Sequence, residues 1–163
     1  MLIRTVTPDD AEDICEIYNP FVTDTDISFE TEPLSPAAMR SRIADLGGRY
    51  PWFVAEDEVS GRIIGFCYAH AWKGVAAYNP TLETTIYVSP SAARSGAGRA
   101  LMSALENECR RRGYKALIAC ITATNSVNIT FHEAIGFHHV SCFKGVATKF
   151  GRLLDVVDLQ LTL

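Results

Sequence analysis

The stretch that decides the fold reads Glu83-Thr84-Thr85-Ile86-Tyr87-Val88-Ser89-Pro90 and resumes shortly afterwards as Arg94-Ser95-Gly96-Ala97-Gly98-Arg99. The β-branched and aromatic residues of its first part predict a strand. Its second part is a short loop with two glycines that leads directly into a run of helical periodicity. Backbone N–H groups of such a loop and of the following helix N-terminus converge on one point. The stretch therefore predicts an anion site, above all for a phosphate or pyrophosphate.

Other nucleotide-binding and hydrolytic motifs are missing. Two nearby glycines are a weak signal alone, because glycines also serve ordinary turns. The loop lacks the Lys-Ser/Thr pair of a P-loop, which argues against an NTPase. It opens the third predicted helix, and no acidic ribose ligand follows at the expected distance, which argues against a dinucleotide enzyme. No G-x-S-x-G motif supports a serine nucleophile.

The composition is typical of a soluble globular protein. Of 163 residues, 48% are apolar and 21% charged, which suits one domain over residues 1–163. The net charge of −4 does not indicate a nucleic-acid partner, and no apolar run is long enough for a membrane span. The cysteines at positions 15, 67, 109, 120 and 142 form no C-x-x-C pair. We therefore expect buried free thiols and, with no secretory signal, a cytoplasmic location.

Hydrophobic periodicity and turn residues divide the chain into elements. Thr7-Pro8 begins a helix expected to end at Asn19-Pro20, and Ser35-Pro36 begins a second that stops at Gly47-Gly48. The predicted strands are 2–6, 52–56, 62–70, 83–89, 115–121, 138–144 and 153–161, and the later helices are 98–112 and about 125–135. The order β-α-α-β-β-β-α-β-α-β-β predicts an α+β fold, with a mixed central sheet flanked by helices.

Two segments carry predictions about burial. The 115–121 strand is almost continuously apolar, as in a central strand covered on both faces. In the helix that begins at Thr124-Asn125, the apolar side chains are expected to face the core. These are Val127, Phe131, Ala134 and Ile135.

Glu83 is the first candidate for catalysis. It opens the strand that leads into the glycine loop, so its carboxylate would lie across the sheet from the expected anion site. In a cleft, burial would raise its pKa towards neutrality and make it a competent general base. The alternative, a solvated carboxylate at a strand end, stays open.

His132 is the second candidate. It follows Asn125 by seven residues and Asn128 by four, so the three polar side chains lie near one face of the same helix. A histidine there can donate or relay a proton, although a lone helical histidine is more often structural. His138-His139 has no acidic or cysteine partner at ligand spacing, so no metal site is expected.

The segment from Thr23 to Pro36 is the least regular polar stretch, with Phe29 as its one large aromatic residue. Loops on a rigid frame often carry binding residues. Phe29 either contributes to a binding site or closes the edge of the core.

Three runs together resemble the acetyl-CoA-binding core of the GNAT N-acetyltransferase superfamily. They are Tyr87-Val88-x-Pro90, Arg94-x-Gly96-x-Gly98-x-x-Leu101 and Asn125-x-x-Asn128-x-x-x-His132-x-x-x-Gly136-Phe137. Further stretches are similar to its phosphinothricin / methionine sulfone acetyltransferase branch. These are Ser28-Phe29-Glu30-Thr31-Glu32-Pro33, Trp72-Lys73, Ala77-Tyr78, Glu83 to Val88, and Lys149-Phe150-Gly151 with Asp155-Val156. The resemblance covers nearly the whole chain.

The resemblance implies a GNAT-like sheet with acetyl-CoA as co-substrate and no metal. The backbone of Ile86, Tyr87 and Val88 would pair with the pantetheine arm where the strand splays at a bulge. Asn125 would bind the arm nearer the thioester, and Asn128 also belongs to the implied cofactor site. The pyrophosphate would be held by the N–H groups of Arg94, Ser95, Gly96, Ala97, Gly98 and Arg99.

The resemblance also implies a reaction, the N-acetylation of a small primary amine such as phosphinothricin, methionine sulfone or sulfoximine, or another amino acid or analogue. Glu83 would deprotonate the ammonium group through a water molecule. His132 would protonate the departing thiolate or assist the base. Phe29, Lys73 and Tyr78 are expected to line the acceptor pocket, and a homodimer is implied.

The sequence departs from that branch at two positions. Ala93 stands where Gln or Arg often contacts the pyrophosphate, and Val75 stands where an arginine would pair with an anionic acceptor. Two other functions stay open: acetylation of a peptide or protein N-terminus, and CoA binding without catalysis.

Overall fold

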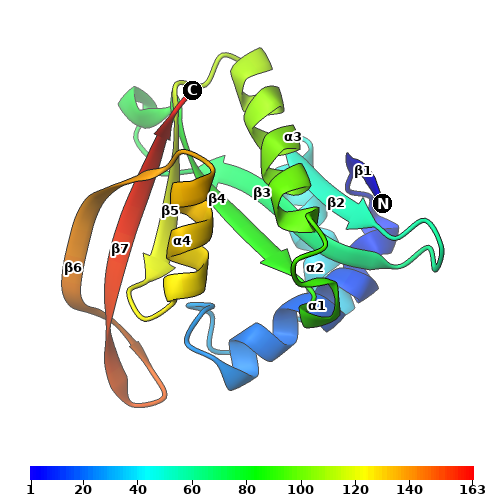
Figure 1. Cartoon of the computed structure of the whole chain (residues 1–163), viewed down its shortest axis with the longest axis horizontal. Helices are drawn as coiled ribbons and strands as arrows, with labels where there is room; N and C mark the ends of the chain where they lie inside the picture. Colours follow the sequence, from blue (N-terminus) through cyan, green and yellow to red (C-terminus); the bar gives the residue numbers. More distant parts are fainter.

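The computed structural model describes all 163 residues and shows one seven-stranded sheet with helices on both faces (Figure 1). The strands are β1 (Leu2–Thr5), β2 (Trp52–Glu56), β3 (Ile63–Ala71), β4 (Thr81–Val88), β5 (Ala116–Thr122), β6 (His138–Lys149) and β7 (Arg152–Thr162). The helices are α1 (Ala11–Asp24), α2 (Pro36–Gly47), α3 (Ala97–Arg111) and α4 (Ser126–Ala134), with short 3₁₀ turns η1 (Pro8–Asp10), η2 (Ala76–Tyr78) and η3 (Pro90–Ala92). The predicted α+β class and element order are confirmed.

The sheet is mixed, in the order β1-β2-β3-β4-β5-β7-β6. Every neighbouring pair is antiparallel except β4 and β5, which are parallel. Strand β5 lies inside the sheet between β4 and β7. Its Leu117, Ile118, Ala119 and Ile121 side chains are buried, which confirms the predicted coverage of both faces.

Each face of the sheet has its own core. Helix α3 covers one face, where Leu101, Met102 and Leu105 pack against Leu117 of β5 and Leu159 of β7. On the other face α1 and α2 bury a second cluster that includes Ile14, Met39, Ile43, Trp52 and Phe66. Each fully buried side chain of this size contributes about 1.5–3 kcal/mol. The two layers cover β2 and β3 from both sides.

Helix α1 does not end at Asn19-Pro20 as predicted but continues to Asp24, with Pro20 inside the helix. A proline in a helix interior costs about 3 kcal/mol. The next turn offsets that cost, because Val22 is fully buried and the Phe21 ring lies 5.1 Å from that of Tyr87. Burial of two such side chains is worth about as much as the proline costs.

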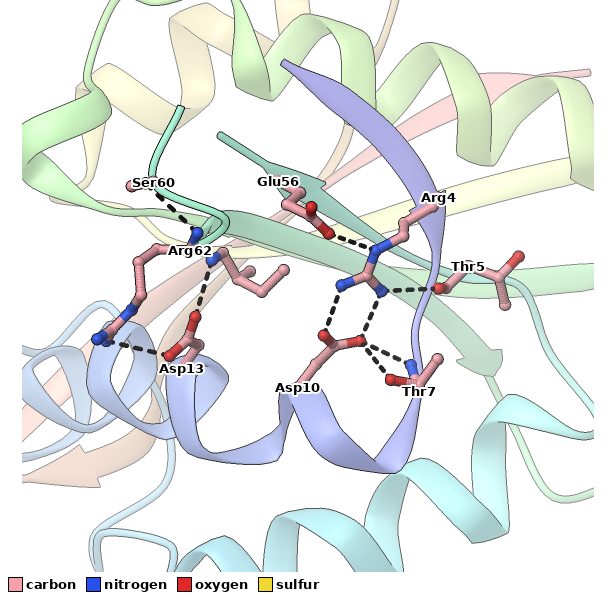
Figure 2. A network of polar contacts seen from close by, with 9 residues as sticks. Arg4, Thr5, Thr7, Asp10, Asp13, Glu56, Ser60 and Arg62 are labelled. Atoms are coloured by element: carbon pink, nitrogen blue, oxygen red, sulfur yellow. Dashed lines mark hydrogen bonds and ion pairs between the residues drawn. The ribbon is translucent and has the colours of Figure 1, made fainter. Parts of the chain in front are cut away.

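A polar network fixes the N-terminal strand to η1 and β2 (Figure 2). The Arg4 guanidinium donates to both carboxylate oxygens of Asp10, at 2.7 and 2.8 Å, and to Glu56 at 2.7 Å. The Thr7 backbone N–H also donates to Asp10, at 2.7 Å. Burial alone would raise the pKa of Asp10, but these hydrogen bonds outweigh it and hold the pKa below its usual value. Asp10 is therefore an ionised, paired group of the folded state.

The prediction for helix α4 is half correct: Phe131 and Ile135 face the core as expected, whereas Val127 and Ala134 do not. Val127 is 81% exposed, and Ala134 is exposed as well. Ile129, Phe131 and Ile135 pack against the α3 side of the core, and His132 is buried. A nine-residue helix contacts the sheet along one narrow stripe, and here the histidine occupies its centre.

Strands β6 and β7 form a longer hairpin than predicted, and β6 runs on to Lys149. Its pairing with β7 shifts register between Phe143 and Ala147, around Gly145, which adopts a φ of 59°. The Asp155 carboxylate accepts the Gly145 N–H at 2.9 Å and so stabilises this irregularity. The predicted turn at Gly151 is confirmed, with a φ of 70°.

The cysteine prediction is only partly correct. All five thiols are free, and Cys15, Cys67 and Cys109 are buried, but Cys120 is half-buried and Cys142 is exposed. No helix of the chain combines the length and apolar character needed to cross a membrane.

Candidate active site

The parallel strands β4 and β5 separate halfway along their length. They pair from Thr81–Ala116 to Thr84–Ala119, and no pair follows. Beyond that point β4 stays with β3 and β5 stays with β7. The sheet therefore opens in a wedge between the ends of β4 and β5, beside α4 and the start of α3 (Figure 1).

The open edge of β4 carries free backbone groups. The Ser89 N–H donates to the Ile64 carbonyl at 2.8 Å, and antiparallel bonds towards one neighbour recur at every second residue. Ile86 and Val88 thus direct their N–H and C=O groups away from β3 and into the wedge. The register of β4 with β3 is continuous from Leu82 to Val88, so the strand opens without the expected bulge.

The glycine loop follows the C-terminal end of β4 and lies at the open end of the wedge. Arg94 and Gly96 have φ values of 64° and 89°, and Gly96 is the residue before α3. The Ser95 hydroxyl accepts the Ala97 N–H, but no group of the chain accepts the N–H of Arg94, Gly96, Gly98 or Arg99. Four free donors at a helix N-terminus suit an anion, so this geometry is compatible with the predicted anion site, which stays a prediction.

Two cavities meet at Glu83. The inner cavity, about 270 Å³, lies in the wedge, where Ile86 and Tyr87 of β4 face Asn128 and His132 of α4. The outer cavity, about 340 Å³, lies between Trp72 and the β6–β7 hairpin. Phe29, Glu83 and Cys120 line both cavities. A molecule that enters the wedge and one that enters the outer cavity therefore meet at this carboxylate.

The environment of Glu83 suits a base. Burial raises the pKa of this carboxyl above its usual value, protonated His70 opposes the rise, and repulsion from Asp158 adds to it. The carboxylate is the third residue of β4 rather than a loosely held strand end, and it is largely enclosed. Of the two alternatives left by the sequence, the enclosed carboxylate is the one present.

His70 of β3 lies directly opposite Glu83 in the sheet register. Its Nδ1 lies 3.0 Å from the Ala71 carbonyl oxygen, and a carbonyl only accepts, so Nδ1 carries a proton. Its Nε2 lies 3.9 Å from the Glu83 carboxylate. When His70 is neutral, a lone pair at Nε2 faces Glu83; when it is protonated, the two groups form an ion pair.

His132 is oriented in a similar way. Its Nδ1 donates to the Asn128 carbonyl at 2.9 Å, and the ring lies edge-on between Phe131 and Phe137. The ring is 1% exposed, and burial lowers the pKa of His132 despite the opposing effect of this hydrogen bond. His132 is therefore neutral at neutral pH, with Nε2 as a hydrogen-bond acceptor in the inner cavity wall.

The α1–α2 loop forms the roof over Glu83 and is firmly tied. Lys149 donates to the Ser28 carbonyl and Thr122 to the Asp26 carbonyl, both at 2.6 Å. The Tyr18 and Ser28 hydroxyls are 2.7 Å apart. Phe29, held by this loop, is 40% exposed and borders both cavities, so it is a cavity wall rather than a plug of the core.

The structure does not bring every predicted site residue onto the cavities. Lys73 and Tyr78 line neither one; both pack on Trp72, with the Lys73 ammonium 4.3 Å from the Trp72 ring. Asn125 caps α4 by accepting the Asn128 N–H at 3.2 Å and does not line the cavity, whereas Asn128 does.

Three groups beside Glu83 were missed by sequence reasoning: His70, Cys120 and Asp158. Cys120 pairs with Asp158 across β5 and β7, and His70 pairs with Glu83 across β3 and β4. Sheet register sets these positions. The only available signal was the alternation of each strand, which does not tell which strands are neighbours.

A mixed sheet that opens at its one parallel pair, beside a helix N-terminus with free N–H groups, is the architecture of an acetyltransferase of the GNAT fold. The sequence agrees: residues 3–157 match the family model described as an acetyltransferase (GNAT) domain. The chain belongs to the GNAT acetyltransferase family.

Two relatives illustrate where it lies in that family. The chain is 34% identical to phosphinothricin N-acetyltransferase of Streptomyces viridochromogenes over 154 residues, 94% of this chain and 83% of that protein. It is 31% identical to L-methionine sulfoximine/L-methionine sulfone acetyltransferase of Salmonella typhimurium, over 100% of this chain and 95% of that protein.

Two solved structures are similar throughout. A phosphinothricin acetyltransferase from Sinorhizobium meliloti, solved with AcCoA, has a TM-score of 0.93 and 36% identity, covering 99% of this chain and 88% of that one. A ribosomal-protein-alanine N-acetyltransferase from Brucella melitensis has a TM-score of 0.95 and 30% identity, covering both chains fully.

Proposed function

We propose that the protein transfers the acetyl group of acetyl-CoA to the primary amine of a small molecule, an amino acid or an analogue of one, with Glu83 as general base. The observation that carries the proposal is the meeting of the two cavities at Glu83. The relatives named for phosphinothricin and for methionine sulfoximine support a small acceptor.

The wedge suits acetyl-CoA, which supplies the activated acetyl group as a thioester. The free N–H groups of Arg94, Gly96, Gly98 and Arg99 fit a pyrophosphate, with Ser95 and Ala97 shaping the loop between them. The free edge at Ile86 and Val88, with Tyr87 between them, fits the two amides of a pantetheine arm, as in strand addition. Asn128 faces the same space, and Asn125 orders the turn that presents it.

Glu83 accepts a proton from the acceptor's ammonium group, directly or through water, and leaves a free amine lone pair. A carboxyl with a raised pKa is a stronger base than an ordinary glutamate, which is what removal of an ammonium proton requires. His70 then provides an exit, because the lone pair at its Nε2 faces the same carboxylate. This proton passes from Glu83 to His70 and on to solvent. The amine lone pair attacks the thioester carbonyl, the C–S bond breaks and CoA leaves as a thiolate; the second proton of the nitrogen balances the charge of that thiolate, which is protonated through solvent.

His132 accepts a hydrogen bond at Nε2 rather than acting as an acid. A neutral imidazole whose only proton is bound to the Asn128 carbonyl has none to give to a thiolate. The sequence left two roles open for His132, protonation of the departing thiolate and assistance to the base. Assistance to the base fits the buried ring better, because Nε2 can only accept a hydrogen bond.

Direct attack on the thioester is favoured over an acetylated enzyme. The only thiol in the cavities is Cys120, and burial raises its pKa to about 12, with Glu83 and Asp158 adding to the rise. A thiol that stays protonated at neutral pH is a poor nucleophile. Cys120 therefore does not take up the acetyl group.

The acceptor binds in the outer cavity, against Phe29 and Trp72. Lys73 and Tyr78 act one layer further out, where they pack on the Trp72 ring and fix its position. Of the three predicted acceptor residues, Phe29 thus forms a wall of the outer cavity, whereas Lys73 and Tyr78 support the wall residue Trp72.

We also propose that the chain is one domain, that it forms a homodimer and that it works in the cytoplasm. The family model spans most of the chain and no break divides the sheet, which supports one domain. The β6–β7 hairpin exposes Val140, Phe150 and Leu153 at its edge, an apolar surface that a second copy can cover. Five free thiols support a reducing compartment.

A panel assay tests this function. Thiol release from acetyl-CoA is measured with amino acids, sulfones, amines and a tripeptide. Turnover on small amines well above that on the tripeptide supports the proposal. Higher turnover on the tripeptide than on small amines would favour acetylation of peptide N-termini. The Brucella melitensis neighbour, a ribosomal-protein-alanine N-acetyltransferase, is the reason to test that function. Binding of acetyl-CoA without turnover on any amine would instead indicate a non-catalytic CoA-binding module.

A further inference from the structure

The charges around the two cavities are all of one sign. The charged side chains that line the inner cavity are Glu30 and Glu83, and those that line the outer cavity are Glu83 and Asp158. No lysine or arginine lines either space. An amine enters such a site as a cation and is attracted to it, whereas a carboxylate or phosphinate is repelled.

The nearby cations are already engaged elsewhere. Lys73 lies over the rings of Trp72 and Tyr78, at 4.3 and 4.8 Å from their centroids. Lys149 donates to the Ser28 carbonyl, and Lys144 pairs with Asp155 at 2.9 Å. Arg42 pairs with Glu30 at 2.7 Å. None of them offers a bidentate partner to an acidic group inside the cavity.

The remaining walls of the outer cavity are apolar. Aromatic rings come from Phe29, Trp72 and Phe143, and aliphatic side chains from Val146 and Val156. Such walls bind a hydrocarbon body by removing it from water, at about 25 cal/mol per Å² of apolar surface. They leave an unpaired anion without a hydrogen bond, which is costly.

Glu83 and Asp158 also lie close to the point where the amine must react. Asp158 of β7 lies opposite Cys120 of β5 in the sheet register, and its negative charge raises the pKa of Glu83. A free amino acid carries its carboxylate one carbon from the amine. That carboxylate would therefore lie beside Glu83 and Asp158, whereas an amide or a hydrogen in its place would not be repelled.

We propose that, among amino acids and their analogues, the preferred acceptor is one with an apolar body and no free acidic group, such as an amino-acid amide or the corresponding arylalkylamine. Its ammonium lies between Glu83 and Asp158, and its body packs against Trp72, Phe143 and Val146. This proposal rests on the proposed acetyl transfer and narrows the class of analogue that the enzyme accepts.

A matched series of acceptors tests it. L-Phenylalaninamide, 2-phenylethylamine, L-phenylalanine and phosphinothricin are compared by thiol release from acetyl-CoA at one pH. We expect kcat/KM for the amide and for phenylethylamine to exceed that for phenylalanine by about tenfold or more, the scale of one like-charge contact in a partly shielded site. An equal or higher kcat/KM for phenylalanine or phosphinothricin would overturn this inference and leave the acetyl transfer standing. No thiol release with any acceptor would overturn both.

Two variants add an independent readout. Asp158→Asn removes one of the two charges, so the ratio of kcat/KM for phenylalaninamide to that for phenylalanine should fall. An unchanged ratio would contradict the role of Asp158. Lys73→Met should change both substrates alike. If it lowered kcat/KM for phenylalanine alone, Lys73 would be the partner of an acceptor carboxylate and the inference would be wrong.

Discussion

Replacement of Glu83 by glutamine tests the centre of the proposed mechanism. The two side chains have nearly the same size and shape, so Glu83→Gln keeps the walls of both cavities and removes only the base. A positioned general base contributes about 10²–10⁴-fold to a rate. At 1.36 kcal/mol for each factor of ten, this is about 2.7–5.4 kcal/mol of transition-state stabilisation.

The fold should not suffer from this change. Because burial raises the pKa of Glu83, the folded state holds its proton to higher pH than the unfolded chain does. Stability therefore falls as pH rises through the folded pKa, and the ionised carboxylate is a destabilising group there. Glu83→Gln should be at least as stable as the parent at pH 8. A thermal unfolding curve checks this and separates loss of catalysis from loss of structure.

The assay is steady-state thiol release at saturating acetyl-CoA, over pH 6–9. The parent should show kcat/KM rising with pH along an acid limb that lies above the ordinary range of a glutamate. The variant should lose about 10²–10⁴-fold in kcat and lose that limb. A folded Glu83→Gln enzyme with near-parental turnover across this range would remove Glu83 from the role of base.

Three further predictions follow from the same structure. The positive charge of protonated His70 holds the pKa of Glu83 down, so His70→Asn should move the acid limb of kcat/KM to higher pH. His138→Asn, at an exposed site, should leave the limb in place. An acid limb at the same pH in His70→Asn and the parent would contradict the pairing of His70 with Glu83. Gly96→Ala places a side chain at a φ of 89°, a strain of about 1–2 kcal/mol, so the loop should rearrange and calorimetry should show roughly tenfold weaker acetyl-CoA binding; Gly74→Ala, with open space and no positive φ, is the matched control. Asp10→Asn breaks the charged hydrogen bonds to Arg4 and should cost about 2 kcal/mol in urea unfolding at pH 7, a difference that shrinks as pH falls through the lowered pKa of Asp10; a constant difference down to acid pH would refute the pairing.

Local sequence signals predicted the elements where one residue imposes a geometry. Ser35 caps α2 by accepting the Ala38 N–H at 3.1 Å, and Gly113 takes a φ of 86° just after α3. Such residues act on their own neighbours, so they are readable without the fold. The prediction was wrong where distant packing decides, as at Pro20, which the burial of Val22 keeps inside α1, and at Val127, which α4 turns to solvent.

The candidate site divides in the same way. The free N–H groups at Gly96 and Gly98 were predictable, because a glycine loop before a helix forms them locally. The opening of β4 from β5 and the pairing of His70 with Glu83 were not, because they depend on which strands are neighbours. A sequence pattern identifies residues able to do chemistry, while sheet register decides which of them meet.

The separation of β4 from β5 has a mechanical consequence. The seven strands form two half-sheets, β1 to β4 and β5 with β7 and β6, joined edge to edge only from Thr81 to Thr84. A pantetheine arm laid along Ile86 and Val88 would extend that short seam and bridge the halves. Saturation at 100 times the dissociation constant adds about 2.7 kcal/mol to the folded state. Bound co-substrate would thus join the two half-sheets, and the complex that is ready to react would be more stable than the free protein.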